Sequence, residues 1–592
     1  WLWFLSDRTF HSLVPSIWGS RQPDPFFDRS TGIYGLALQK SFRSPFEPPD
    51  ELHPEAKEAE EGPKGKGGKA AAAVAPLELD GLPQRLVQVP AGTGNFSDLA
   101  TDGKQLYVLD AATTLAHERS LEAIAIAPEK HEPQTVLAGV TAYELSANGR
   151  KLLVRTGDAL HVFDAGPKPP ADLASTTVSL KDWTFTVDPR IEWTQMFREG
   201  WRLERDYFYD RHMNGVDWPA MLARYRPLAE RVTDRNELND LFGQMIGELS
   251  ALHMFVRGGD ARRGDDQALP ASLGADLERD AAAGGWRIAR IYRTDPDLPD
   301  EGSPLAAPGL DVREGDVVRA VNGTPTLSVA DPAALLRQQA GRQVLLGIGR
   351  AGAAPRDVIV RPLAPGRDAD LRYSAWEYAC RQRVDSLGAG RIGYLHLRAM
   401  GPDDIARWER DYYPVFDRDG LVIDVRNNSG GNIDAWILGK LLRRVWFYWQ
   451  PRVGHPEGNM PFAFLGHVVV LVNERTSSDG EAFAEGFRRL GLGRVIGTRT
   501  WGGEIWLSSD NFLVDHGIAT AAEVGVYGPE GTWLIEGHGV DPDIRVDDLP
   551  RATYAGADAQ LDAAVRELQA EIRAQPVVHP GPPAYPDKSG PR

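Results

Sequence analysis

Hydrophobic and polar positions follow different periods in successive parts of the chain. The first part contains short β-rich runs separated by turn residues: WLWFLSD from residue 1, QLYVLDAAT from 105 and KLLVRTGDALHVFDAG from 151. This pattern predicts a strand meander. Similar pieces starting at Gly103 and Gly149 recur after about one propeller-blade period of 40 to 50 residues. We therefore predict that residues 1–190 are the C-terminal part of a β-propeller, with two unrelated hairpins in a sandwich as the alternative.

Residues 47–75 interrupt this strand pattern. They are rich in Pro, Gly, Lys and Glu and almost free of large apolar side chains. Such a segment buries too little apolar surface to offset the entropy of ordering. We predict a flexible insertion between strands.

The pattern becomes helical at Glu192. EWTQMFREGWRLERDYFY places its aromatic and aliphatic residues on one face, and Asp234 and Glu237 have the spacing of a capping box before LNDLFGQMIGELS. The helical period ends in ALHMFVRGGD, where the pattern shifts towards a strand. Residues 191–262 are therefore predicted to form a small helical subdomain.

Residues 263–365 are predicted to form a separate β-rich module. WRIARIY and VLLGIGR are predicted strands and DPAALLRQQ a short helix, and Asn322-Gly323 is a tight-turn pair. The stretch GLDVREGDVVRAVNGTP closely resembles PDZ domains. That resemblance implies a module that captures extended peptide ends by strand addition. The alternative is a module that only braces its neighbours.

Residues 366–574 are predicted to form an α/β domain. The strands within GRIGYLHL, GLVIDVRN, HVVVLVN and RVIGTRT are continuously apolar and separated by helical stretches. Such strands indicate a sheet covered on both faces. DAQLDAAVRELQAEIRA is a predicted amphipathic helix, and residues 575–592 are predicted to be a flexible tail.

Composition narrows the class of protein. At 592 residues the chain is too long for one core. Its 66 basic against 83 acidic side chains, a net charge of -17, disfavour nucleic-acid and anionic-membrane partners. Its longest apolar runs are too short to cross a bilayer. The single cysteine, Cys380, is interpreted as a buried thiol. Because the chain opens with Trp1 in a strand-like run, we expect it to be the downstream part of a longer protein.

Candidate chemistry begins at Ser478, which follows a predicted strand and precedes the helix EAFAEGFRRL. A serine at this point lies at the positive end of a helix dipole and suits a nucleophile. The alternative is structural, because Ser478 and Glu481 also have capping-box spacing.

Two further segments of the same domain supply complementary groups. The glycines of DVRNNSGGN follow a buried strand and can point backbone N–H groups at developing negative charge, as an oxyanion hole requires. Glu536, in LIEGHGVDPD, follows an apolar strand end, where a partly buried carboxylate can orient a base.

The order of DVRNNSGG, TSSDGEAF, GTRTWGG and EGHGVDPDI resembles the tricorn protease family and, more distantly, the carboxyl-terminal-processing peptidases, with the tail-specific, crotonase-like catalytic fold. The resemblance implies that Ser478 is the nucleophile. It also implies that the backbone N–H of Asp479 is one oxyanion donor and that of Gly431 the other, with Gly430 as the alternative.

The resemblance also implies a base and an acid. His253, in ALHMFV, matches the general base, and Glu536 matches the acid that completes the charge network. The sequence departs from the family at Leu252, where the tricorn pattern has a serine that links the histidine to the glutamate. His538 is the rival base, because it lies near Glu536 in the sequence.

The processing-peptidase branch instead uses a lysine base in a segment similar to T-F-G-K. The corresponding stretch here is TWGGE, with Gly503 in the lysine position. A Ser–Lys dyad is therefore disfavoured, and a histidine base is expected.

The resemblance implies a cytoplasmic serine peptidase that trims peptides, forms a homo-hexamer with the propeller filtering entry, and needs no metal or organic cofactor. Two alternatives stay open. One is a peptide-binding scaffold with impaired catalysis, which Leu252 favours. The other is an extracytoplasmic processing peptidase, which a signal peptide in a preceding segment would distinguish. Cleavage preference stays open as well.

Overall fold

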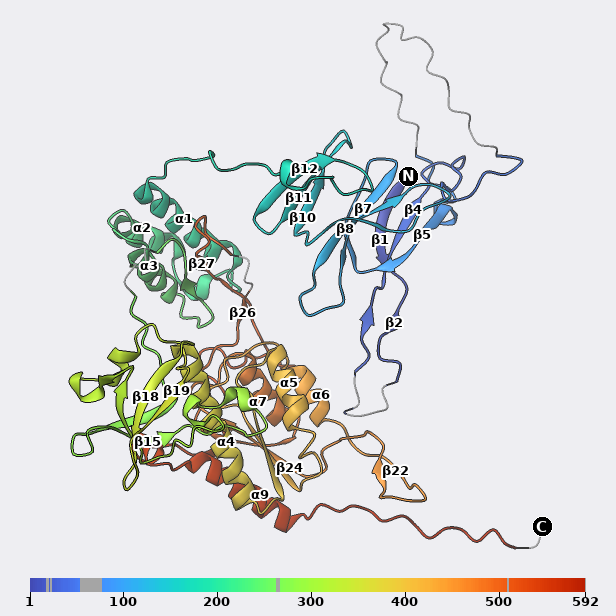
Figure 1. The fold of residues 1–592 in the computed structure, drawn as a ribbon. Helices are drawn as coiled ribbons and strands as arrows, with labels where there is room; N and C mark the ends of the chain where they lie inside the picture. The colour runs from blue at the N-terminus through green and yellow to red at the C-terminus, as the bar shows by residue number, and fades with distance from the viewer. Residues whose placement is uncertain are drawn as a thin grey trace. The chain divides into compact units, whose positions relative to one another are not determined.

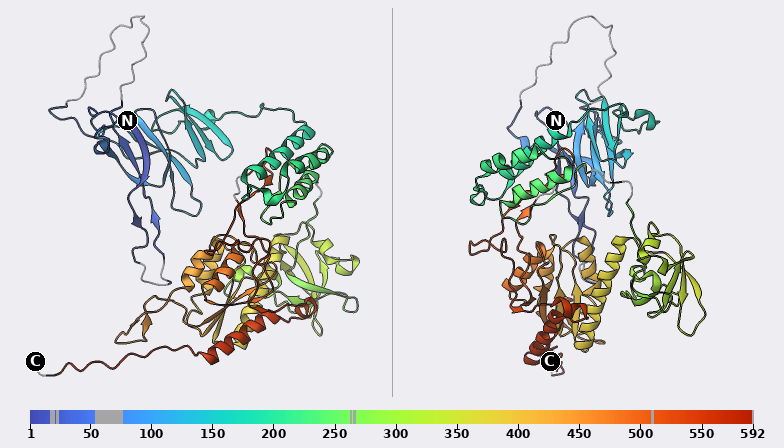
Figure 2. Two further views of the ribbon diagram at one scale, coloured as in Figure 1. Left: turned by 180° about the vertical axis from the view of Figure 1, so that it is seen from behind. Right: turned by 90° about the vertical axis from the view of Figure 1, so that its left-hand side faces the viewer.

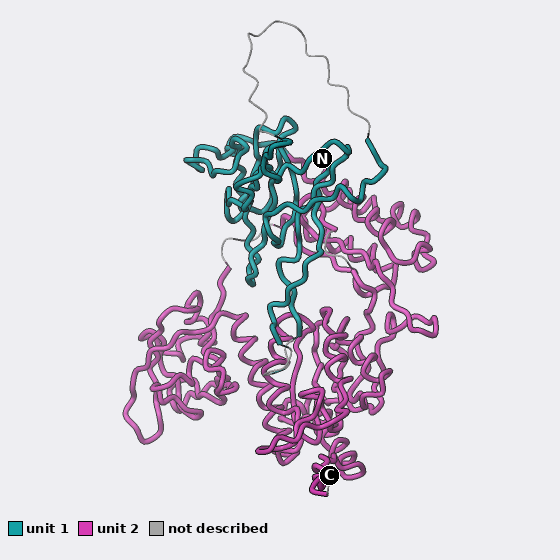
Figure 3. Tube along the Cα trace, turned by 90° about the vertical axis from the view of Figure 1, so that its right-hand side faces the viewer, with its two compact units in different colours: residues 1–186 teal, residues 187–592 magenta. Residues whose placement is uncertain are grey.

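A computed structural model describes residues 1–16, 21, 24–53, 77–261, 264, 267–507 and 511–590. The chain divides into two compact units, residues 1–186 and 187–592 (Figure 3). Each unit is described by itself. Residues 54–76, which make up most of the predicted flexible insertion, lie outside the described part of the chain.

The first unit is built from antiparallel β-sheets. A three-stranded sheet has the order β1-β4-β5, a four-stranded meander has the order β6-β7-β8-β9, and a second three-stranded sheet has the order β10-β11-β12. Strands β2 and β3 form a short ladder. The bounds are β1 Leu2–Asp7, β2 His11–Ser12, β3 Phe27–Asp28, β4 Thr31–Leu36, β5 Leu86–Gly94, β6 Phe96–Thr101, β7 Gln105–Ala111, β8 Arg119–Ala125, β9 Gln134–Ala138, β10 Ala142–Leu145, β11 Lys151–Thr156 and β12 Ala159–Asp164.

Strand β7 shows why these sheets stack. Leu106 and Val108 belong to one buried cluster, whereas Tyr107 and Leu109 belong to another. Because successive side chains of a strand point to opposite faces, the four-stranded sheet buries apolar groups on both sides. The strand meander predicted from the sequence is confirmed; the propeller remains a prediction.

The second unit begins with three helices, α1 Pro189–Tyr207, α2 Trp218–Ala229 and α3 Arg235–Gly247. Each follows an aspartate whose carboxylate accepts a hydrogen bond from an amide of the first turn, as at Asp234. Their apolar faces form one core around Phe197, Leu238 and Phe242. The predicted helices at 192 and after Asp234 are confirmed.

A segment from the C-terminal half of the chain completes this helical core. Ile505, Leu513, Ala519 and Ala522 pack in the same cluster as the three helices. Figure 1 shows β27 among α1, α2 and α3. The local strands are β13 Val256–Arg257, β26 Trp506–Leu507, β27 Ile518–Ala519 and β28 Ala522–Val524. We call residues 505–524 the arm; its residues 508–510 lie outside the described part.

An antiparallel sheet follows, in the order β14-β15-β16-β18-β19 with β17 paired to β16. Its strands are β14 Ala275–Asp280, β15 Gly285–Ile291, β16 Val317–Val321, β17 Thr324–Pro325, β18 Val344–Gly349 and β19 Arg356–Val360. Asn322 and Gly323 have φ values of 50° and 80° and join β16 to β17, as the turn prediction requires.

The predicted short helix DPAALLRQQ is shorter and tighter in the structure. It is a 3₁₀ helix over Pro332–Leu336, capped by the Asp331 carboxylate. The chain becomes extended at Arg337, and the amide of Gln338 donates to the carbonyl of Leu269. Pairing with that non-local segment replaces the second helical turn.

The last part of the chain surrounds a parallel five-stranded sheet, in the order β20-β21-β24-β25-β29. Helix layers cover both of its faces, with the red C-terminal helix α9 along one of them (Figures 1 and 2). The elements are α4 Pro365–Leu387, β20 Ile392–His396, α5 Pro402–Asp411, β21 Gly420–Asp424, α6 Asp434–Leu441, β22 Tyr448–Trp449, β23 Glu457–Gly458, β24 His467–Val472, α7 Asp479–Arg489, β25 Gly493–Gly497, β29 Ile544–Arg545, α8 Pro550–Tyr554 and α9 Ala559–Ala574.

Strand β24 explains the continuous apolar pattern. Val468, Val470 and Val472 pack in the cluster that includes α5, α6 and α7, whereas Val469 and Leu471 pack in the cluster that includes α4 and α9. Both faces of the strand are therefore buried, as predicted. The described residues beyond Gln575 form neither helix nor strand. Among the described helices, none has the length and apolarity needed to span a bilayer.

Candidate active site

Ser478 lies at the junction between β24 and α7. Its φ of 54° and ψ of -130° are uncommon for a residue with a side chain. Such a conformation persists only where the surroundings hold it. The Ser478 amide donates to the Glu481 carboxylate at 3.1 Å, and the Glu481 amide donates to the Ser478 carbonyl at 2.6 Å. The Ser478 hydroxyl makes no side-chain capping bond to the described residues of this turn.

Glu481 connects the serine turn to the loop that follows β25. Its side chain is fully buried. The carboxylate accepts hydrogen bonds from the amides of Gly502 at 2.7 Å and Gly503 at 3.0 Å, and from the Thr500 hydroxyl. Burial raises the pKa of Glu481, although these donors oppose the shift. The TWGG segment therefore contributes backbone donors here, where the processing-peptidase pattern has a lysine.

The glycine loop after β21 packs directly against this serine. A Cβ atom at Gly430 would lie 2.4 Å from the Ser478 Cβ, and one at Gly431 would lie 1.9 Å from the Met400 carbonyl oxygen. The φ values of 81° and 156° also favour glycine. Because β21 and β24 are neighbouring parallel strands, the loops after their carboxyl ends meet at one edge of the sheet.

The backbone N–H groups of the glycine loop and of the residue after Ser478 differ in their hydrogen bonding. The amide of Gly430 donates to the Asn428 side chain at 2.9 Å. In contrast, the amides of Gly431 and Asp479 have no hydrogen-bond partner among the described residues. This difference favours Gly431 over Gly430 as an oxyanion donor.

The Asp479 side chain fixes the two loops to each other. One carboxylate oxygen accepts from the amides of Ile433 at 2.7 Å and Asp434 at 3.1 Å, at the start of α6. Burial, followed by the neighbouring Asp434 charge, raises the pKa of Asp479 to about 7. The residue after the serine thus holds the helix that follows the glycine loop.

His253 lies between α3 and β13 and is 5% exposed. Its ring makes an edge contact with Trp501, with centroids 5.3 Å apart, and its Nδ1 has no hydrogen-bond partner in the described structure. Burial lowers the pKa of His253, while the Glu536 charge and the Ile505 carbonyl oppose that shift. The structure shows no hydrogen bond between His253 and Ser478 within the described chain. Instead, His253 contacts Trp501, and the two residues after Trp501 donate to Glu481.

Glu536 contacts the histidine segment through the main chain. Its carboxylate accepts from the Leu252 amide at 3.1 Å, and from the amides of Glu504 at 2.8 Å and Ile505 at 3.2 Å. The leucine side chain at position 252 therefore does not separate the glutamate from the histidine segment, because the backbone makes the contact.

His538, the rival base, has a different environment. Its Nε2 lies 2.7 Å from an Asp541 carboxylate oxygen, and its side chain is 59% exposed. The structure thus pairs His538 with an exposed aspartate three residues away, whereas His253 is buried against Trp501.

Comparison with known proteins identifies the family. Protein-family models match the chain as the tricorn protease C1 domain over residues 189–247, the tricorn protease PDZ domain over 271–365 and peptidase family S41 over 391–546. Tricorn protease homolog 1 of Streptomyces coelicolor is 36% identical over 526 residues, which are 85% of this chain and 48% of that protein. The chain belongs to the tricorn protease family.

The tricorn fold extends across most of the chain. A crystal structure of the tricorn protease superposes with a TM-score of 0.80 at 22% identity, over 96% of this chain and 54% of that one. The chain spans about half the length of these relatives. The distant relation to processing peptidases is also found, since the chloroplastic C-terminal processing peptidase of Tetradesmus obliquus is 23% identical over 60% of this chain and 77% of that protein.

Sequence reasoning missed Glu504, whose amide donates to the Glu536 carboxylate. Its side chain is 1% exposed, and one carboxyl oxygen accepts from the Trp506 indole at 3.3 Å. Burial, with the nearby charges of Glu481 and Asp479, raises the pKa of Glu504 to about 9, so this carboxyl is uncharged at neutral pH. The signal was a lone acidic residue inside the otherwise apolar and glycine-rich TWGGEIW.

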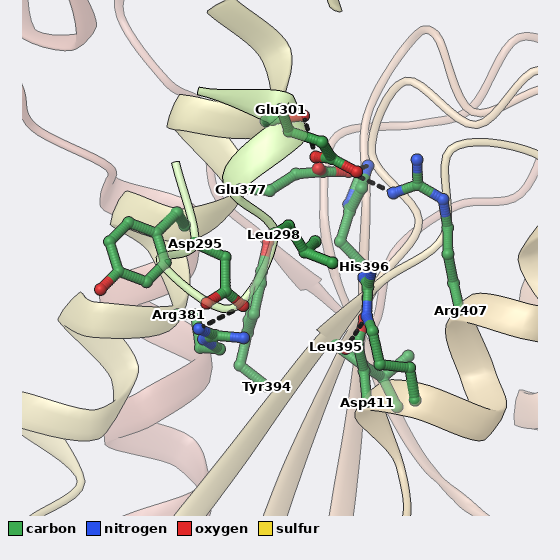
Figure 4. A pocket seen from close by; sticks show the side chains of 13 residues that line it. Asp295, Leu298, Glu301, Glu377, Arg381, Tyr394, Leu395, His396, Arg407 and Asp411 are labelled. Atoms are coloured by element: carbon green, nitrogen blue, oxygen red, sulfur yellow. Dashed lines mark hydrogen bonds and ion pairs between the residues drawn. The ribbon is translucent and has the colours of Figure 1, made fainter. Parts of the chain in front are cut away.

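A separate polar pocket of about 50 Å³ lies between the loop at 295–301 of the PDZ region and α4, β20 and α5 of the S41 region (Figure 4). Its charged groups pair with one another: Arg381 with Asp295 at 2.7 Å, and Arg407 with Glu377 at 3.5 Å. The five predicted site residues do not line it. In the described part of the chain, no group of three or more His, Cys, Asp or Glu side chains is arranged to hold a metal ion.

Proposed function

We propose that this chain hydrolyses peptide bonds through an acyl-enzyme, with Ser478 as nucleophile, His253 as general base and Glu536 as the acid that supports the histidine segment. The amides of Gly431 and Asp479 are the proposed oxyanion donors. The observation that carries the proposal is a serine held at positive φ near two N–H groups that have no hydrogen-bond partner among the described residues. Such donors are aimed where charge develops in acyl transfer.

The proposed reaction has two balanced halves. Ser478 Oγ bonds to the substrate carbonyl carbon while His253 takes the hydroxyl proton, and the two amides bind the resulting oxyanion. The C–N bond then breaks, and His253 returns the proton to the leaving amine. Water attacks the ester in the same way, which releases the carboxylic acid and restores the Ser478 hydroxyl.

The wider assignments rest on the family. We propose that residues 1–190 are the end of a β-propeller, as the sequential four-stranded meander β6–β9 supports. We assign residues 191–262 to the helical subdomain, 263–365 to the PDZ-like domain, 366–574 to the peptidase domain and 575–592 to a tail. Peptides or unfolded chains are the proposed substrates, in a cytoplasmic homo-hexamer.

Leu252 favours a second candidate, a peptide-binding scaffold with impaired catalysis. The side chain that links histidine and glutamate in the family pattern is replaced by an apolar one, and the contact that Leu252 makes with Glu536 comes from its backbone amide. A reactive serine distinguishes the candidates, because a scaffold has no need of one.

A fluorophosphonate probe is expected to label Ser478, and the labelling rate should depend on pH. The base must be uncharged, and burial lowers the pKa of His253 below its ordinary value of about 6.5. Labelling should therefore fall as the pH is lowered, with a midpoint below about 6.5. Mass spectrometry of the labelled peptide locates the site. Absence of label at every pH would favour the scaffold, and a midpoint above about 6.5 would contradict His253 as base.

Gly431→Ala is expected to lower kcat by about a hundredfold to a thousandfold, the usual effect of losing one oxyanion donor. The added Cβ would overlap the Met400 carbonyl, so the loop must shift and carry the Gly431 amide away from Ser478. Gly439→Ala is the matched control, because that glycine lies in α6 with open space around its Cβ position. Equal kcat values for both variants and the wild type, with unchanged melting temperatures, would remove Gly431 from the proposed site.

A further inference from the structure

A buried ion pair joins the helical subdomain, which also carries His253, to the arm. Arg235, the first residue of α3, places its Nε 2.6 Å from one carboxylate oxygen of Asp515 and its Nη2 3.4 Å from the other. The two side chains are 1% and 2% exposed. The pair thus connects two segments that are 280 residues apart in the sequence.

The surroundings of this pair are shaped to fit it. Asp515 also accepts hydrogen bonds from the amides of Asp260 at 3.1 Å and Gly517 at 3.0 Å. A Cβ atom at Gly259 would lie 2.4 Å from the Asp515 carboxylate, and one at Gly517 would lie 2.3 Å from the Arg235 guanidinium. The glycines of both segments therefore allow the two backbones to pack closely around the ion pair. Burial alone would raise the pKa of Asp515, but Arg235 and the two amides lower it overall, which favours the carboxylate.

The segment that follows His253 is also paired to the arm. In β13 and β27, Val256 lies opposite Ala519 and Arg257 opposite Ile518. The Phe255 amide donates to the Thr520 hydroxyl at 2.8 Å, and the Thr520 amide donates to the Phe255 carbonyl at 3.0 Å. His253 comes two residues before Phe255. Its position is therefore set by where the arm lies.

We propose that the Arg235–Asp515 ion pair is a positioning device for the general base: it fixes the arm against α3, so that β13 and β27 pair in register and His253 faces the site of Ser478. This inference rests on the proposed function, because it presumes that His253 is the base. Arg235 and Asp515 are positioning residues, since neither contacts the reacting atoms.

The chemistry of a buried ion pair sets the expected size of the effect. Removing one partner leaves the other charged and buried without compensation, so the local structure rearranges. A displacement of about 1 Å at a catalytic group can lower the rate by about a hundredfold. Ser478, Gly431 and the PDZ region lie outside the rearranged contacts, so substrate binding should change little.

The test compares Asp515→Asn and Arg235→Lys with the wild type on a fluorogenic peptide. Asp515→Asn is expected to lower kcat by about tenfold to a hundredfold with KM within about threefold of wild type. Arg235→Lys keeps the positive charge but loses the bidentate contact with the carboxylate. Its kcat should therefore lie between that of Asp515→Asn and that of the wild type. Hydrogen exchange of residues 252–257 should accelerate in both variants.

Asp316→Asn is the matched control. Asp316 is a buried aspartate in an ion pair with Arg350, and it directly precedes β16 of the antiparallel sheet. This variant should lower the melting temperature but leave kcat unchanged. If Asp515 has a purely structural role, Asp515→Asn should show the same pattern. If Asp515→Asn does not fold, Arg235→Lys decides the question.

The outcomes separate this inference from the proposed function. If His253→Ala abolishes turnover while Asp515→Asn and Arg235→Lys keep wild-type kcat, the positioning role is wrong and the base assignment stands. If His253→Ala keeps wild-type kcat, the base assignment itself fails. A fall in kcat in both ion-pair variants, without a matching change in Asp316→Asn, supports the inference.

Discussion

Ser478→Ala is expected to abolish peptide turnover, with a fall in kcat on the order of 10⁶-fold. The hydroxyl is the only group in the proposed mechanism that forms a bond to the substrate, so no neighbour can replace it. The fold should survive, because the hydrogen bonds that hold this turn come from the Ser478 backbone and not from its side chain. Digestion of a peptide library, followed by mass spectrometry, measures the residual rate.

Ser477→Ala provides the control for this prediction. Ser477 carries the neighbouring hydroxyl, which donates to the Asn428 carbonyl at 3.0 Å. Losing one such hydrogen bond costs about 1 kcal/mol, so this variant should still cleave peptides readily. If Ser478→Ala keeps its turnover and Ser477→Ala loses it, the nucleophile is Ser477 and the proposed assignment is wrong.

The carboxyl groups around Ser478 explain why its unusual backbone conformation is maintained. Glu481 holds the serine amide and the TWGG loop, and Asp479 holds the start of α6. Both side chains are buried, so their hydrogen bonds are made in a region of low dielectric constant. The acidic residues of the TSSDGEAF motif therefore stabilise the loops that carry the two proposed oxyanion donors.

Local patterns predicted much of this architecture. The apolar run of β24 with the helix after it placed Ser478 at a strand–helix junction, and Asp234 marked the start of α3. Both features depend on residues within a few positions of each other. The parallel sheet followed from the same kind of pattern, because strands buried on both faces lack polar alternation.

Non-local contacts could not be predicted in the same way. The hydrophobic pattern around Ile505, Leu513, Ala519 and Ala522 does not indicate that these residues enter the core formed by α1, α2 and α3, far earlier in the chain. The Arg235–Asp515 pair and the contact of Glu536 with the Leu252 amide likewise join segments that are 280 and 284 residues apart. The sequence indicates that Leu252 cannot connect His253 to Glu536 through its side chain. In the structure the Leu252 main-chain amide donates to Glu536 instead.

The second large effect is expected at His253, the proposed general base. His253→Ala is expected to lower kcat by about as much as Ser478→Ala, because nucleophile and base act as a unit. The double variant should accordingly be no slower than either single one. KM should change little, since His253 is buried against Trp501 and the proposed oxyanion donors lie on other segments.

His538→Ala is the matched control for the base. His538 lies in the EGHGVDPDI motif beside Glu536 in sequence, but its ring pairs with Asp541 at an exposed position. Replacing it should leave kcat within about twofold of wild type, because exposed ion pairs contribute little. Steady-state kinetics of Ser478→Ala, His253→Ala and His538→Ala on one fluorogenic peptide decides which histidine is the base. Loss of turnover in His538→Ala, with turnover kept in His253→Ala, would transfer the role of base to His538 and remove the helical subdomain from the chemistry.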